Sequence, residues 1–310
     1  MQGTLRSSED AEIHLRIRTY GEGPSDSGDP ADDLPHGAGW RAPVTTAVDA
    51  AARIEGTYAE EPLAPVTATL RAMFGTSTEL PGLAPDLLVT DVAGWTPAAR
   101  FADERLPDLI ESARRRWRAQ PHAEAALAWK AYTYWLALPA VLGWASARRV
   151  PLLTGDSVLF HFDDPRPLVT LGLRADIEVA VLPSDPIALG GDPRVKVVPD
   201  EGALLAELRR SLLDEHLSPM LDAIHGMVRL GRRTLLGSLS SGVAYGVLRS
   251  ADVLPGSSAE TIGTLLDALG VADLIELVPG PTGKLDVRRK TCCLAFTLPQ
   301  PRICSGCCIR

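Results

Sequence analysis

All 5 cysteines of this 310-residue chain lie between positions 292 and 308. Cys292 and Cys293 are adjacent, ten residues follow, and Cys304 and Cys307 then stand two residues apart, with Cys308 directly after them. Thiols gathered this densely are typical of three structures: a disulfide framework, a structural zinc site or an iron–sulfur cluster. The spacing and the rest of the chain help to separate the three.

Disulfides are disfavoured by the character of the chain. The segment from Met1 to Asp10 is polar and lacks a basic stretch followed by an apolar run, so we expect no secretory signal and a cytoplasmic location. A chain of 310 residues also forms a sizeable core without covalent staples. Clustered cysteines in a cytoplasmic protein bind metals or take part in catalysis more often than they form structural disulfides.

Zinc and iron–sulfur remain as alternatives on residue types alone. Structural zinc usually takes separated Cys-x-x-Cys pairs or their histidine versions, and here no histidine follows His225. Neighbouring side chains on a strand point to opposite faces, so an adjacent pair chelates one ion poorly. A two-iron cluster spreads four thiolates over two irons and tolerates such a pair where the backbone is irregular. Gly306 gives the second cysteine pair the freedom for a tight turn.

The run Arg289–Leu294, followed by Cys304–Cys307, resembles the C-terminal signature of the FhuF-type ferric-siderophore reductases. The usual ferredoxin spacings differ from it. The resemblance covers only this segment of the chain. It implies a [2Fe-2S] cluster whose ligands are Cys292, Cys293, Cys304 and Cys307. Cys308 exceeds the four-cysteine pattern, and we interpret it as a spare thiol.

The same resemblance implies a function. We expect an oxidoreductase that releases iron by one-electron reduction of a ferric siderophore, with no catalytic side chain beyond the cluster. The sequence has no flavin or nicotinamide fingerprint, so electrons must come from a separate donor protein such as a ferredoxin or a flavin reductase. The net charge of -8 argues against nucleic-acid binding. Peripheral association with a membrane is left open.

Two other functions compete with this one. The first is a siderophore-binding or synthetase-related protein without redox activity, in which the cysteines hold structural zinc. The second is an electron-transfer partner of some other enzyme. The long chain ahead of the cysteines favours a bound substrate over a simple electron carrier.

Basic residues beside the cysteines are candidates for substrate binding. Arg289 and Lys290 precede the first pair, and Arg302 precedes the second. On a strand, Arg289 points to the opposite face from its neighbours, so these residues cannot all face one site. The alternative is that they are solvated edge charges. The cluster of arginines in residues 114–118 is either a second docking surface or a helix terminus whose charge suits the helix dipole.

The fold class that we expect is α+β: a helix-rich body, a small antiparallel sheet and a C-terminal cluster-binding segment. Residues 1–40 read as a flexible tail and linker, because residues 21–39 are rich in Gly, Pro, Asp and Ser. The siderophore-binding body spans residues 41–290, and the cluster segment spans 291–310. Within the body we expect a helical part, a β-rich part and a second helical part at residues 41–149, 150–199 and 200–272.

Hydrophobic periodicity predicts the individual elements. Residues 123–147 are the most apolar, and Lys130 and Pro139 interrupt them, so we predict a buried core helix and not a membrane span. Further helices are predicted at 43–59, 65–74, 102–119, 204–231, 232–249 and 259–269. Strands are predicted at 12–19, 157–162, 168–171, 177–182, 195–198, 274–278 and 285–298. The histidines His216 and His225 lie on one helical face, and we interpret them as core or surface residues.

Overall fold

The structure, a computed structural model, describes residues 60–74, 82–162, 168–280, 283–304 and 306–309. Tyr58–Arg310 is one compact unit. It contains many helices and three small sheets, so the predicted α+β class is confirmed. The strand predicted at 12–19, the helix predicted at 43–59 and the boundary predicted at residue 40 lie outside the described residues.

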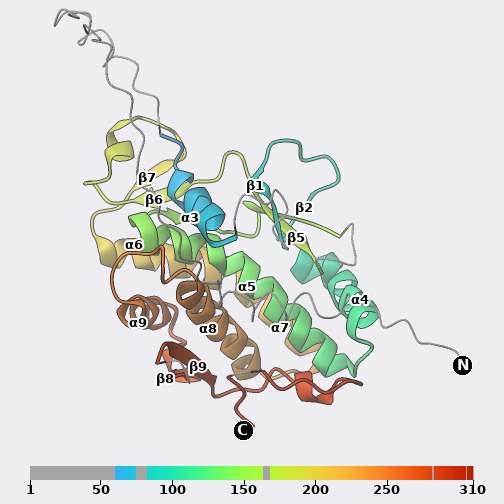
Figure 1. Ribbon diagram of the computed structural model, residues 1–310. Coiled ribbons are helices and arrows are strands. Elements are labelled where there is room, and N and C mark those ends of the chain that lie inside the picture. Colours follow the sequence, from blue (N-terminus) through green and yellow to red (C-terminus); the bar gives the residue numbers. More distant parts are fainter. Residues whose placement is uncertain (1–59, 75–81, 163–167, 281–282, 305, 310) are drawn as a thin grey trace, which may run out of the picture. The chain divides into compact units, whose positions relative to one another are not determined.

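Helix α5 (Pro121–Ala147) lies at the centre of the helical part, and α8 (Arg232–Arg249) runs beside it (Figure 1). Trp129 and Trp144 on α5 are 0% and 2% exposed. The helix is apolar all round because its neighbours cover it on several sides. The predicted core helix is therefore confirmed. Among the described residues, none of the helices combines the length and the hydropathy that crossing a bilayer would require.

The other helices follow the predicted segments closely. A π-helical turn (Phe101–Arg105) begins the segment of α4, and a longer π-helical stretch (Arg209–Leu217) joins α6 to α7. Gly270 ends α9 with a φ of 68°, which the predicted glycine stop requires. The remaining α-helices are α3 (Ala64–Phe74), α4 (Leu106–Trp117), α6 (Glu201–Leu208), α7 (Ser218–Val228) and α9 (Ser258–Leu269).

Three separate sheets take the place of the single antiparallel sheet that we expected. The first has the order β1-β5-β4-β2, the second β3-β6-β7, and the third is the pair β8-β9. Their strands are β1 (Leu83–Val89), β2 (Thr96–Pro97), β3 (Val150–Pro151), β4 (Val158–His161), β5 (Thr170–Arg174), β6 (Val179–Val181), β7 (Val195–Val197), β8 (Ile275–Pro279) and β9 (Leu285–Arg289).

The expectation of an antiparallel sheet was wrong for β6 and β7, and the unpredicted strand β1 adds a second parallel pair. Strand β5 pairs in parallel with β1, which comes from a distant part of the sequence, and β6 pairs in parallel with β7. The chain returns between β6 and β7 through a short 3-10 helix (Pro186–Leu189) and its flanking turns, so a full crossover helix is not needed. We predicted no strand at β1, where positive φ angles at Asp86 and Leu87 break the regular alternation.

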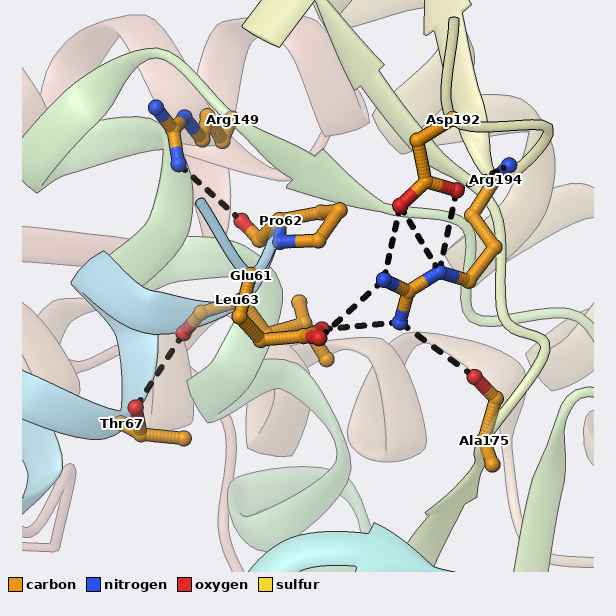
Figure 2. A network of polar contacts seen from close by, with 8 residues as sticks. All are labelled: Glu61, Pro62, Leu63, Thr67, Arg149, Ala175, Asp192 and Arg194. Atoms are coloured by element: carbon orange, nitrogen blue, oxygen red, sulfur yellow. Dashed lines mark hydrogen bonds and ion pairs between the residues drawn. The ribbon is translucent and has the colours of Figure 1, made fainter. Parts of the chain in front are cut away.

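An ion-pair network fixes the segment before α3 to the second sheet (Figure 2). The Arg194 guanidinium donates to Glu61 at 2.9 and 3.1 Å and to Asp192 at 2.8 Å. The same arginine holds the pKa of Asp192 below its usual range. At the end of α5, Arg149 donates to Asp185 at 2.7 and 3.0 Å and to Glu60. Because both guanidinium groups are paired with carboxylates, we interpret this network as structural.

A buried polar pair, His216 and Tyr132, links the π-helical stretch to α5. The Tyr132 hydroxyl lies 2.6 Å from His216 Nε2, and the Leu153 carbonyl lies 2.8 Å from Nδ1. Burial lowers the pKa of His216 from 6.5 to about 4. The unfolded chain therefore binds a proton more readily between these two pH values. The free energy of unfolding is therefore highest above pH 6.5 and should fall as the pH drops toward 4. This group accounts for roughly 3 kcal/mol of that fall.

This expectation can be measured by urea unfolding at pH 7 and at pH 4.5. His216→Gln should flatten the pH dependence between these values. His225→Gln is the matched control, since His225 is exposed on α7, and it should keep the wild-type slope. A wild-type stability that does not change over this window would contradict the assignment of His216 as a neutral core residue.

Candidate metal centre

The two cysteine pairs are brought together by the pairing of the last residues with β9. The Arg289 N–H donates to the Gly306 carbonyl at 2.9 Å. A Cβ on Gly306 would lie 1.8 Å from the Val287 carbonyl oxygen and 2.9 Å from the Tyr245 hydroxyl. Only glycine fits there, because any side chain would collide with the strand. The Gly306 that the sequence suggested for a tight turn is therefore needed for close packing.

Residues between β9 and the first cysteine pair are fixed to the turn before β8 and to helix α8. The Lys290 N–H donates to the Leu274 carbonyl at 2.9 Å. Thr291 is buried against Gly237 of α8, where an added Cβ would lie 1.9 Å from the Thr291 Oγ1. Gly237 thus leaves the space that lets the cysteine segment reach the helix bundle.

The backbone around the adjacent pair is irregular. Strand β9 ends at Arg289, so the predicted strand to residue 298 was wrong. Leu294 has a φ of 62°, and a 3-10 turn (Ala295–Thr297) follows. The Leu294 N–H lies 3.3 Å from Cys292 Sγ and donates to it. The alternation that would point Cys292 and Cys293 to opposite faces of a strand therefore does not apply here.

The second pair forms a turn closed by a hydrogen bond from the Cys307 N–H to the Cys304 carbonyl at 3.1 Å. Cys304 also reaches the first pair, because it packs against the small hydrophobic cluster that contains Cys293. Cys307 is half-buried, whereas Cys308 is exposed. All five cysteines are free. One cysteine from each half of the motif thus lies in the same small hydrophobic cluster.

Electrostatics differ among the thiols. The neighbouring Cys304 lowers the pKa of the Cys293 thiol, and the cations Lys130 and Arg289 lower it further. The same contact raises the pKa of Cys304. Burial, with the nearby sulfurs of Cys293, Cys307 and Cys308, raises the pKa of Cys292. Further thiolates beside Cys293 therefore need additional positive charge.

Hydrophobic side chains enclose the two inner sulfurs, those of Cys293 and Cys304. Cys293 is 4% exposed and packs with Leu127 of α5. The end of α4 covers the same place through Trp117. Ala119, Ala295, Leu298 and Cys304 complete this small hydrophobic cluster. In Figure 1 the segment after β9 passes beneath the ends of the helices, where it meets α5.

The predicted substrate-binding residues separate into three environments. Lys290 is exposed and Arg302 is half-buried. Arg289, by contrast, is 2% exposed, and its Nη2 donates to Ser238 Oγ of α8 at 3.1 Å. A side chain this deeply buried does not offer a surface to a dissolved siderophore, so our expectation that Arg289 contacts substrate was wrong. The opposite orientations of Arg289 and its neighbours were predicted correctly.

Sequence reasoning missed Lys130 as part of this site. It is half-buried on α5, and its charge lowers the pKa of both Cys293 and Cys304. We noted it only as an interruption of the most apolar helix. A lone lysine in such a helix was the available signal, since a cation at that place needs an anionic partner.

The chemistry of the side chains fits an anionic metal–thiolate group. Arg289 Nε, Arg289 Nη1 and Thr291 Oγ1 are buried donors with no hydrogen-bond partner in the described part of the chain. They belong to residues directly before Cys292 and Cys293, which are free thiols. No group of three or more Cys, His, Asp or Glu side chains is already arranged around a single metal ion among the described residues. His216 and His225, whose Nδ1 atoms each face a backbone carbonyl, lie in other parts of the fold.

The chain was also compared with known proteins. No protein-family model matches it, and no curated protein is significantly similar to it. The interpretation of this site therefore depends on the cysteine motif and on the residues that surround it.

Proposed function

We propose that Cys292, Cys293, Cys304 and Cys307 hold a [2Fe-2S] cluster, and that the protein uses it to reduce ferric siderophores in the cytoplasm. The observation that carries the proposal is that Cys293 and Cys304 pack in one small cluster, next to the strand end where two buried donors of Arg289 have no partner in the described chain. The motif's resemblance to the FhuF-type reductases supplies the cofactor and the substrate class. A cluster with four thiolate ligands is anionic, and the cations Lys130 and Arg289 supply the opposite charge.

The residues have separable tasks in this proposal. The four cysteines would hold the irons, and Cys308 is a spare thiol. Leu127, Trp117 and Leu298 limit the access of water to the inner sulfurs, and burial of this kind tunes a reduction potential. When bound, the cluster supplies single electrons. Siderophores hold Fe(III) through hard oxygen ligands and hold Fe(II) far less well, so one electron releases the metal without an acid or a base.

The proposed function is tested by mixing chemically reduced protein with a ferric hydroxamate siderophore under anaerobic conditions. We expect one equivalent of Fe(II), trapped by a ferrous chelator, for each protein that returns to its oxidised spectrum. A reduced protein that keeps its spectrum in the presence of ferric siderophore, yet is oxidised by another redox protein, would favour the electron-transfer alternative. Zinc without iron in the purified protein would favour the structural zinc alternative.

Charge should guide the substrate to this site. Lys290 and Arg302 lie at the surface beside the cysteines, and residues 114–118 lie at the end of α4 that contacts the same segment through Trp117. A Lys290→Ala, Arg302→Ala double variant should slow the reduction of an anionic ferric siderophore severalfold at low ionic strength. The difference from wild type should shrink as salt is added, because salt screens exposed charges.

Arg71→Ala is the matched control for this measurement. Arg71 is an exposed arginine of α3, and α3 meets α5 near Gly143, whereas the cysteine segment meets it at Leu127. At 1.5 Å per residue these two points are roughly 24 Å apart along the helix. Equal rates for the double variant and the control at low ionic strength would place the docking surface elsewhere, with the arginines of α4 as the next residues to replace.

A further inference from the structure

Arg289 is a buried cation that pairs with no carboxylate among the described residues. Its side chain is 2% exposed, and of its guanidinium nitrogens Nη2 alone has a hydrogen bond, to Ser238 Oγ, within the described chain. Arg149, another buried arginine of this fold, has acidic partners. At 4% side-chain exposure it is paired with Asp185 and Glu60. A buried guanidinium that lacks such partners is unfavourable, so its presence needs a separate explanation.

The position of Arg289 supplies the explanation. It is the last residue of β9, directly before the cysteine segment, and its backbone N–H binds Gly306 of the second cysteine turn. Cys293, the most buried of the cysteines, lies four residues further along the chain. Nε and Nη1, which have no hydrogen-bond partner in the described chain, are therefore available to donate to the thiolates of this segment.

We propose that Arg289 is the buried counter-charge of the metal–thiolate centre and donates hydrogen bonds to its sulfur atoms. It is a positioning residue, because it acts through the ligands and touches no substrate. The inference rests on the proposed function only in that a metal is held by these cysteines. It has two consequences. The metal-free protein should tolerate the loss of the guanidinium, and the loaded protein should lose metal-dependent stability and a favourable interaction with the added electron.

The first consequence can be tested by comparing Arg289→Met with Arg288→Met. Arg288 is the preceding residue of β9, and it is exposed on the opposite face, near Glu276. Thermal unfolding of each protein is measured with and without bound metal. For Arg289→Met we expect an unchanged or higher melting temperature without metal, and a smaller rise on metal binding than in wild type. For Arg288→Met we expect the wild-type rise.

An Arg289→Met protein that unfolds at a much lower temperature without metal would overturn the inference. It would show that the guanidinium stabilises the polypeptide itself. The same conclusion would follow if Arg289→Met failed to fold while Arg289→Lys folded, since any folded apoprotein would then need a cation there. An equal metal-dependent rise in Arg289→Met and Arg288→Met would also overturn it.

The second consequence is a change in reduction potential. Loss of a nearby positive charge disfavours the reduced cluster, so Arg289→Met should be harder to reduce than Arg288→Met. We expect about a tenfold change in the equilibrium constant, equivalent to about 59 mV for one electron. Arg289→Lys should recover part of this shift. Identical potentials in all three variants would overturn the inference, whereas the metal found in the wild-type protein decides the proposed function separately.

Discussion

Serine at any one of Cys292, Cys293, Cys304 or Cys307 should abolish or strongly weaken iron binding, whereas Cys308→Ser should keep it. Loss of an outer-sphere partner alone typically costs 10–100-fold in metal affinity, and loss of a ligand should cost more than about 100-fold. The structure explains why Cys307 and Cys308 should differ. Cys307 is half-buried in the turn that Gly306 fixes to β9, and Cys308 points outward.

This prediction is checked by iron and sulfide analysis and by the visible spectrum of each purified variant. Cys308→Ser serves as the internal control, because it is the same chemical change one position away. A colourless Cys308→Ser protein together with a coloured Cys307→Ser protein would move the fourth ligand to Cys308. Retention of the full spectrum in all five variants would exclude cysteine ligation.

Gly237→Ala should have the second largest effect. The added methyl group would meet Thr291 Oγ1 at 1.9 Å and its Cβ at 2.9 Å, so the helix or the cysteine segment must move. Overpacking of this kind typically costs 1–3 kcal/mol, and we expect a loss of about that size in the metal-bound protein. Because the strain falls on the residue next to Cys292, the variant should also release its metal faster to a chelator.

Gly242→Ala on the same helix is the control. Its added methyl group would approach Tyr134 at 3.4 Å, which is ordinary contact, and alanine is the better helix former. We expect unchanged or slightly higher stability and normal metal retention. If Gly237→Ala behaves like Gly242→Ala in both unfolding and metal release, the packing of Thr291 against α8 does not position the cysteines.

Local signals predicted the helices well. The helix α9 ends at Gly270, its predicted stop, and α8 has the bounds that periodicity assigned. Strand pairing was harder to predict. The parallel partner of β5 is β1, a strand with two positive φ angles and a proline that no simple alternation would identify.

The candidate ligands could be predicted from sequence because all of them lie in one short segment. Their surroundings could not. Lys130, Leu127 and Ser238 come from α5 and α8, and only the packing of those helices brings them to the cysteines. Strand alternation gave the correct side for Arg289. The reading of that side as a surface for substrate was wrong, because β9 has helix α8 on that face.

Metal analysis combined with anaerobic spectra of the purified full-length protein tests the central claim most directly. We predict about two irons and two acid-labile sulfides per chain, as a [2Fe-2S] cluster contains. The oxidised protein should absorb above about 400 nm through sulfur-to-iron charge transfer, bleach on reduction and then show the paramagnetic signal of a single unpaired electron. A colourless protein with one zinc per chain and no signal after reduction would contradict the account.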